Sequence, residues 1–275
     1  MNISELIVKT EHGDIAVAMT ASDGPPVLLI HGNSNCKETW RHQWDSPLGE
    51  RYRIIAPDLP GHGGSTDAPD PEKSYNMPAY AEMCWSVLDA LEAEAPVVIG
   101  SSLGGHVGIE MIPLRDQLKG LLICGTPPVT NAGPEAIAEG FIISDEIGHA
   151  GKNELTEEEI RELADIAFIP GTVEDWSLEA VRRTDGRARE LMFAHFGGGQ
   201  ASDQRAIVET NKTPLAVVNG ADDAFMNHDY IGNLNYANLW DGQVILLPGL
   251  HHLPFYEDPA VFNPILERFL ADVTG

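Results

Sequence analysis

Residues 97–104 read VVIGSSLG, a continuous apolar run that ends in a G-x-S-x-G pentapeptide. This pattern is typical of a sharp turn from a buried strand into a helix, in which the central residue has a strained backbone. Side chains two positions before and after that residue would collide, which accounts for the glycines at 100 and 104. Such a turn raises the Ser102 hydroxyl above the carboxyl edge of a sheet. We therefore predict that Ser102 is a nucleophile, with a serine in an ordinary tight turn as the alternative.

Apolar runs of strand length recur along the chain on both sides of this turn. The middle runs are apolar throughout, as expected for parallel strands that are covered on both faces. Helical patterns separate the runs, and this alternation predicts an α/β fold with an eight-stranded, mostly parallel sheet flanked by helices. The predicted strands are Glu5–Lys9, Ile15–Met19, Val27–Ile30, Tyr52–Ala56, Val97–Gly100, Leu121–Cys124, Leu215–Asn219 and Val244–Leu247.

Two amphipathic patterns predict helices that cover this sheet. Apolar residues within Tyr80–Leu91 recur at the three- and four-residue spacing of one helix face. Near the end of the chain, Asp258 and Pro259 form an N-cap and first-turn pair, and an apolar stripe follows at 262–270.

The stretch 128–212 interrupts the alternation with helices and turns. Within it, Thr156 and Glu159 have the spacing of a capping box at a helix start. Because the strand pattern resumes afterwards, we predict a helical cap at 128–212, inserted after the sixth strand into a core domain of 1–127 and 213–275. An independent second domain is the alternative.

Composition limits the class of protein. A chain of 275 residues can bury a sizeable core without disulfide or metal support. Its 42 acidic and 17 basic residues give a net charge of −25, which opposes binding to nucleic acid and to anionic membranes. The three cysteines, at 36, 84 and 124, have neither the spacing of a disulfide framework nor that of a CxxC motif. The sequence also contains no signal peptide and no apolar run of about 18 residues. We therefore expect a cytoplasmic protein without cofactor, metal or membrane segment, either a monomer or a homodimer.

A serine nucleophile needs a base that takes its proton and an acid that orients the base. In the chain order that this turn requires, the acid follows a later strand and the histidine comes last. Asp222 and Asp223 follow the seventh predicted strand, and His251 and His252 follow the eighth. Each role therefore has two adjacent candidates. The N–H of Leu103, directly after the nucleophile, is a predicted donor to the oxyanion.

Five motifs together resemble the α/β-hydrolase superfamily over nearly the whole chain. They are LLIHGN at 28–33, DLPGHG at 58–63, the G-x-S-x-G turn, G-x-x-D ending at Asp223 and H-x-P-x-x-E-x-P beginning at His252. The resemblance implies the α/β-hydrolase fold, with Asp223 as the acid and His252 as the base. It also implies Asn33 as the second oxyanion donor, through its backbone N–H, with its side-chain amide near the substrate. A structural Asx-turn is the alternative for Asn33.

The same resemblance excludes some activities. Haloalkane dehalogenases and epoxide hydrolases of the superfamily need a carboxylate nucleophile, and Ser102 occupies that position. His31, Asp58 and His62 are expected to organise loops rather than to react. The sequence contains no nucleotide-binding fingerprint and no H-E-x-x-H zinc motif.

Further strings resemble bacterial hydrolases that open N-acylhomoserine lactone rings. These strings are HGNS at 31–34, APDLPGHG at 56–63, GTPPV at 125–129 and RTDGRAR at 183–189. Three features differ from those lactonases. Ser101 stands where they carry tryptophan, Asp223 stands where they carry glutamate, and residues 81–229 contain no tyrosine like the one their cap supplies. The resemblance implies a serine hydrolase that cleaves an ester or a lactone through an acyl-enzyme intermediate, with an N-acylhomoserine lactone as the leading substrate.

For each of several apolar cap residues we expect packing between cap and sheet, with the wall of an acyl tunnel as the alternative. Phe141 is predicted to contact the substrate. The other candidates are Ile142, Ile143, Phe168, Trp176, Met192 and Phe193. We expect the arginines at 182, 183, 187 and 189 to pair with acids of the cap, with an anion-binding site as the alternative. A carboxylesterase or carbon–carbon-bond hydrolase with the same triad is an alternative function, and a ligand receptor on this scaffold is a third.

Overall fold

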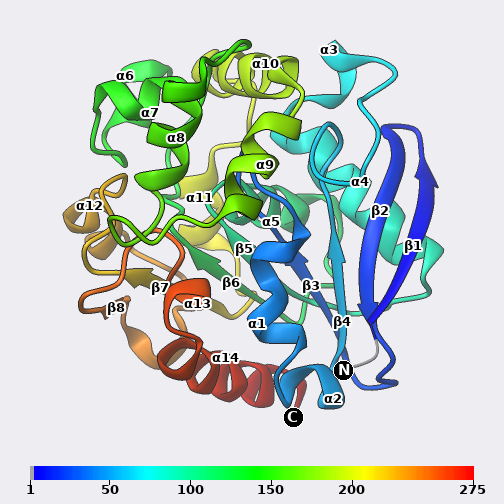
Figure 1. Ribbon diagram of the computed structural model, residues 1–275. Coiled ribbons are helices and arrows are strands. Elements are labelled where there is room, and N and C mark those ends of the chain that lie inside the picture. The colour runs from blue at the N-terminus through cyan, green and yellow to red at the C-terminus, as the bar shows by residue number, and fades with distance from the viewer. Residues whose placement is uncertain (1–2) are drawn as a thin grey trace.

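Across residues 3–275, which the computed structural model describes, eight strands form one sheet in the order β1-β2-β4-β3-β5-β6-β7-β8 (Figure 1). The strands are β1 Ile3–Thr10, β2 Gly13–Thr20, β3 Pro26–Ile30, β4 Arg53–Pro57, β5 Val97–Ser101, β6 Gly120–Cys124, β7 Leu215–Gly220 and β8 Ile245–Leu247. β1 and β2 pair antiparallel, β2 is antiparallel to β4, and the strands from β3 to β8 run parallel. All eight predicted strands are confirmed, with ends within two residues of those expected.

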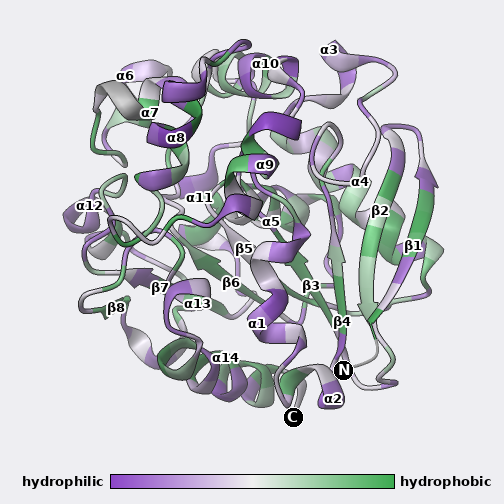
Figure 2. Cartoon of the chain, in the orientation of Figure 1, coloured by the Kyte–Doolittle hydropathy of each residue, from purple (hydrophilic) through white to green (hydrophobic). Residues whose placement is uncertain are grey.

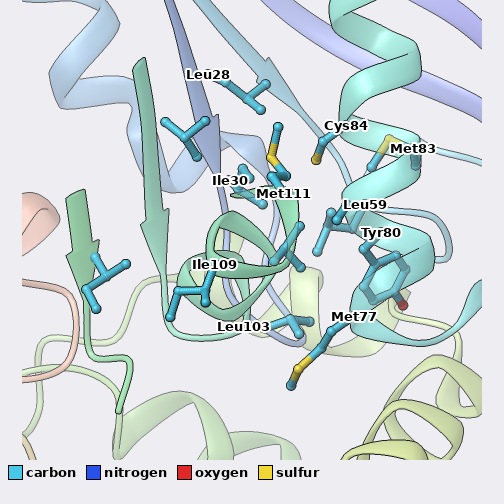
Figure 3. Packing of buried hydrophobic residues seen from close by; sticks show 14 of the residues in the cluster. Leu28, Ile30, Leu59, Met77, Tyr80, Met83, Cys84, Leu103, Ile109 and Met111 are labelled. Carbon is cyan, nitrogen blue, oxygen red and sulfur yellow. The ribbon is translucent and has the colours of Figure 1, made fainter. Parts of the chain in front are cut away.

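The sheet is covered on both faces, which explains why its middle strands are apolar throughout. Successive residues of β3 enter opposite core clusters: Leu28 and Ile30 pack on one face, and Val27 and Leu29 on the other. On the first face they meet apolar side chains of α4 (Met77–Ala90) and α5 (Leu103–Leu114), including Met83, as the close view shows (Figure 3). Figure 2 shows the hydrophobic character of these strands.

The other face is covered by helices from both ends of the chain. These are η1 Lys37–Trp40, α1 Arg41–Trp44, α2 Leu48–Arg51, α13 Pro254–Glu257 and α14 Pro259–Thr274 (Figure 1). Asp258 caps α14 as predicted, because its carboxylate accepts the N–H groups of Ala260 and Val261. The stripe predicted at 80–91 lies on α4, which begins after Asn76; the Asn76 side chain accepts the Ala79 N–H.

Six helices lie between β6 and β7 and extend over one end of the sheet (Figure 1). They are α6 Pro134–Ala138, α7 Asp145–His149, α8 Glu157–Asp165, α9 Asp175–Arg183, α10 Gly186–Gly197 and α11 Gln204–Thr210. The capping box of Thr156 and Glu159 is present at the start of α8. Parts of this segment share core clusters with the sheet, through Phe168 on one face and Met192 on the other. The division into a core of 1–127 and 213–275 and a cap of 128–212 stays a prediction.

The remaining short helices are α3 Pro71–Ser74, α12 His228–Gly232 and η2 Trp240–Gly242. Within residues 3–275, no helix has both the length and the apolar character needed to span a bilayer.

Candidate active site

Ser102 lies at a sharp turn between β5 and α5, with φ 52° and ψ −119°. A Cβ at Gly100 would lie 2.3 Å from the Gly104 carbonyl oxygen, and a Cβ at Gly104 would lie 2.1 Å from the Ile30 carbonyl oxygen. Both distances are far below van der Waals contact, so only glycine fits at either position. The steric reason that the sequence suggested for these glycines is therefore present in the structure.

The turn is held in place by the next strand. The Ser102 N–H donates to the Cys124 carbonyl at 2.7 Å, and the Thr126 hydroxyl donates to the Ser102 carbonyl at 2.8 Å. The Ser102 side chain stands at the N-terminus of α5, where the helix dipole favours negative charge. This environment suits a serine oxygen that becomes anionic during attack.

Asp223 and His252 form a buried pair at the same edge of the sheet. Asp223 follows β7, His252 follows β8, and the His252 Nδ1–H donates to Asp223 Oδ2 at 2.7 Å. The other Asp223 oxygen accepts the Phe225 N–H at 2.9 Å, and the Phe225 ring meets the imidazole edge-on at 4.7 Å. The pairing leaves His252 Nε2 free to accept a proton.

The neighbouring candidates make other contacts. The Asp222 backbone N–H donates to the Leu250 carbonyl, and the His251 N–H donates to Glu257 Oε2 at 2.7 Å. Of the two aspartates and two histidines that the sequence left open, the structure brings Asp223 and His252 together.

A glycine that the sequence analysis did not single out lies beneath the imidazole. Gly125, after β6, has φ +59°, and a Cβ there would lie 2.6 Å from His252 Cε1 and 2.8 Å from Nδ1. No local pattern indicates this role, because Gly125 and His252 come from different strand ends.

Ser102 and His252 both line one cavity of about 270 Å³. Among the hydrogen bonds of residues 3–275, none joins the Ser102 hydroxyl to the imidazole. Catalytic hydrogen bonds often tighten only when substrate binds, and rotation of the serine side chain changes this distance without a backbone shift.

Two backbone N–H groups beside this cavity are placed to hold an oxyanion. In the described part of the chain, neither the Asn33 nor the Leu103 N–H donates to a protein acceptor. Asn33 follows β3 and lines the cavity, while its side-chain amide donates to the Ala150 carbonyl at 2.8 Å. The Asn33 side chain therefore also ties this loop to the segment above it.

Four of the seven candidate tunnel residues line the cavity: Phe141, Ile143, Phe168 and Phe193. The other three candidates do not line it. Ile142 is half exposed, Met192 is buried in the core, and Trp176 donates its indole N–H to the Tyr256 hydroxyl at 2.9 Å. The cavity also has walls that the sequence analysis missed, among them Ser34, Asn35, Ser177, Phe196, Phe225 and Met226.

His31, Asp58 and His62 organise loops, as expected. The Leu59 N–H donates to His31 Nε2 at 2.9 Å, and Asp58 accepts both the backbone N–H and the ammonium of Lys37. Burial lowers the pKa of His31 and of His62, which keeps both rings neutral.

The arginine cluster pairs with cap acids only in part. Arg182 contacts Glu157 and Glu179, and Arg187 contacts Asp185. The prediction was wrong for the two others: Arg183 pairs with an acid outside the cap, Asp67, and Arg189 forms no ion pair with a carboxylate among residues 3–275.

Arg189 is buried and donates to backbone carbonyls instead, including those of Lys152 at 2.8 Å and Asn153 at 3.1 Å. Burial lowers its pKa. Its side chain therefore joins separate turns of the segment above the sheet, a role that charge counting along the sequence does not reveal.

Comparison with known proteins gives consistent matches. The model of the Alpha/beta hydrolase family matches residues 27–265. A solved structure of the N-acyl homoserine lactonase AidH complexed with N-butanoyl homoserine has a TM-score of 0.94 and 42% identity, covering 100% of this chain and 98% of that one. A mutant of the same lactonase with N-hexanoyl homoserine has a TM-score of 0.95 and 41% identity, covering 99% of this chain and 98% of that one.

More distant relatives match as well. An uncharacterized protein of Mycobacterium tuberculosis is 27% identical over 288 residues, covering 95% of this chain and 80% of the relative. The structure of the esterase RhEst1 from Rhodococcus sp. ECU1013 has a TM-score of 0.78 and 25% identity, covering 99% of this chain and 100% of that one.

Proposed function

Since the chain belongs to the alpha/beta hydrolase family, we propose that it is a serine hydrolase that opens the ring of a short-chain N-acyl homoserine lactone. Its class is that of an esterase or lactonase. One observation carries the proposal: Ser102 lies at the strained turn and shares an apolar cavity with His252, which is paired to Asp223.

In the proposed reaction, His252 Nε2 takes the hydroxyl proton as Ser102 Oγ attacks the lactone carbonyl carbon. Asp223 stabilises the imidazolium that forms. The backbone N–H groups of Asn33 and Leu103 hold the oxyanion, and losing one such donor typically costs about 10²–10³ in rate.

Collapse of this intermediate breaks the ring C–O bond, and His252 gives its proton to the departing alkoxide. That alcohol stays tethered to the acyl group, which is now esterified to Ser102. Water, deprotonated by His252, then attacks the ester carbonyl, and the proton returns to Ser102 as the hydroxy acid leaves.

The size of the cavity favours a short acyl chain. Its volume of about 270 Å³ is just below the usual range of small-molecule pockets, about 300–1,000 Å³. Aromatic and aliphatic side chains from the helices between β6 and β7 form most of the wall, which suits an acyl chain together with a compact ring. The AidH complexes contain butanoyl and hexanoyl compounds, which are short as well.

We further propose that Ser177 provides a polar contact where related lactonases use a cap tyrosine. Ser177 lies in the first turn of α9, is buried and lines the cavity. Within residues 3–275, its hydroxyl has no hydrogen-bond partner in the protein. A hydroxyl without a protein partner, on a residue that lines the cavity, is available to a lactone or amide oxygen.

The proposal is tested by mass spectrometry of ring opening with N-butanoyl and N-hexanoyl homoserine lactone, beside a simple aryl ester. Ser102→Ala should reduce turnover by about ten-thousandfold or more. Ser101→Ala is the matched control, because the Ser101 hydroxyl is buried with no partner to lose. Wild-type rates in Ser102→Ala would reject the nucleophile, and faster cleavage of the aryl ester than of every lactone would favour a carboxylesterase. Failure of a serine-directed probe to label Ser102 would favour a receptor.

Ser177→Ala needs its own measurement. It should raise KM for lactones while leaving hydrolysis of a small aryl ester unchanged, because the lost contact serves the bound lactone and not the triad. Equal effects on both substrates would contradict the role.

We also propose a cytoplasmic location, which the three free, buried cysteines support. The net charge of −25 supports the absence of a nucleic-acid partner.

A further inference from the structure

A cluster of metal-ligating side chains lies away from the catalytic cavity, where the β1–β2 turn meets α4. The turn supplies Glu11 and His12, and α4 supplies Glu82. His12 Nε2 lies 3.7 Å from Glu11 Oε1 and 3.9 Å from Glu82 Oε2. Figure 1 shows β1 and β2 beside α4.

His12 supplies the second, independent observation. Its side chain is 1% exposed, although both carboxylates are more than half exposed. Its Nδ1 is 3.1 Å from the Ser74 hydroxyl, whereas Nε2 is buried with no hydrogen-bond partner in the described residues. A buried nitrogen left unpaired costs free energy, and this one faces two acids.

If Nδ1 carries the proton that bonds Ser74, the Nε2 lone pair faces two negative carboxylates. A bound cation would satisfy all three groups at once.

We propose that Glu11, His12 and Glu82 bind a divalent transition metal of the Zn²⁺ type. One atom from each residue lies within 4.8 Å of the others. Ligand atoms about 2.0–2.2 Å from a tetrahedral zinc lie about 3.4 Å apart, so small side-chain rotations complete the site. An imidazole with carboxylates suits Zn²⁺ better than Mg²⁺ or Ca²⁺, which prefer oxygen ligands.

Ser74 is placed to orient the histidine ligand through a hydrogen bond, without itself binding the metal. A metal-binding histidine normally donates its other ring N–H to a nearby acceptor, which fixes the tautomer and the ring orientation. The Ser74 hydroxyl, at the end of α3, is such an acceptor for His12 Nδ1. The imidazole is thus oriented before any ion arrives.

Lys73 is the local competitor for the ion. Its ammonium donates to Glu11 Oε2 at 2.6 Å, while the other oxygen of this carboxylate, Oε1, lies 3.7 Å from His12 Nε2. A positive charge here repels a metal ion, so removing it should strengthen binding.

A bound metal would link the turn between β1 and β2 to α4. None of the three ligands lines the catalytic cavity, so the site is structural and its test is independent of hydrolysis.

The experiment titrates chelator-treated, full-length protein with Zn²⁺ in competition with a chromophoric zinc indicator. We expect saturable binding of one Zn²⁺ that Glu82→Gln and Glu11→Gln each weaken by about tenfold or more. Glu94→Gln, at an exposed acid elsewhere, is the matched control and should not change it. Lys73→Gln should tighten binding.

His12→Asn tests the nitrogen ligand, because its amide can still donate to Ser74. Zn²⁺ affinity should fall in this variant. Its hydrolytic activity should not change, and unchanged activity shows that the fold is intact. Wild-type affinity in Glu82→Gln would overturn the proposal, as would equal competition by Ca²⁺ or Mg²⁺, since neither outcome is compatible with an imidazole–carboxylate site.

Discussion

Gly125→Ala places a methyl group against the imidazole of His252, the proposed catalytic base. The new Cβ would lie 2.6 Å from His252 Cε1, 2.8 Å from Nδ1 and 3.4 Å from Asp223 Oδ2. Since ordinary carbon–carbon contacts lie at about 3.5–4.0 Å, the ring must retreat by about 1 Å. The alanine must also adopt φ +59°, a conformation that costs an L-residue about 1–2 kcal/mol.

These two effects predict two separable losses. Displacing a catalytic group by about 1 Å costs about 10²-fold in rate, equivalent to about 2.7 kcal/mol of transition-state stabilisation. The backbone strain acts on the folded state as a whole and should lower Tm by about 2–8 °C for a protein of this size.

The assay is kcat/KM for ring opening of N-hexanoyl homoserine lactone, with Tm measured on the same preparations. Gly242→Ala is the matched control: its φ is +66°, and its added Cβ would meet no atom within 4 Å. We expect a loss of Tm in both variants, larger in Gly125→Ala because the buried ring is also displaced, and loss of activity in Gly125→Ala alone. Gly125→Ala with kcat/KM within threefold of the wild type would refute the packing argument.

Three further predictions follow from individual side chains. Asp223→Asn should lower kcat by about 10⁴ by favouring the wrong tautomer of its partner, whereas Asp222→Asn should stay within about twofold; steady-state kinetics compares them. Burial depresses the pKa of His106 from 6.5 to about 4. As the pH falls, this histidine therefore gains its proton first in the unfolded chain. About 3 kcal/mol of the free energy of unfolding is lost between pH 6.5 and pH 4. His106→Asn, which can still donate to Gln204 Oε1, should reduce this loss in urea unfolding at pH 7 and 4.5; an unchanged pH dependence would contradict the assignment. Phe141→Ala should enlarge the cavity and raise the ratio of kcat/KM for decanoyl over butanoyl lactone about tenfold, and an unchanged ratio would place the acyl chain elsewhere.

The sequence by itself determined the sheet and the serine turn. The apolar runs give all eight strands because burial on both faces requires apolar residues at successive positions, a property of a few neighbouring residues. Gly100 and Gly104 likewise indicate the turn. The atoms that exclude a larger side chain at these positions belong to the turn itself or to the neighbouring strand β3. The cap on α14 and the capping box on α8 were predictable for the same local reason.

Tertiary structure decided everything that depends on two distant segments meeting. The motifs G-x-x-D and H-x-P-x-x-E-x-P point to Asp223 and His252, but adjacent residues of a turn point in different directions. Only the packing of β7 beside β8 shows that these two side chains meet. The same holds for Gly125 beneath the imidazole. Apolar cap residues look alike in sequence, and whether each faces the cavity or the core depends on how its helix is rotated against the sheet. Local sterics and burial are encoded in neighbouring residues, whereas the composition of the site depends on contacts between residues far apart in the chain.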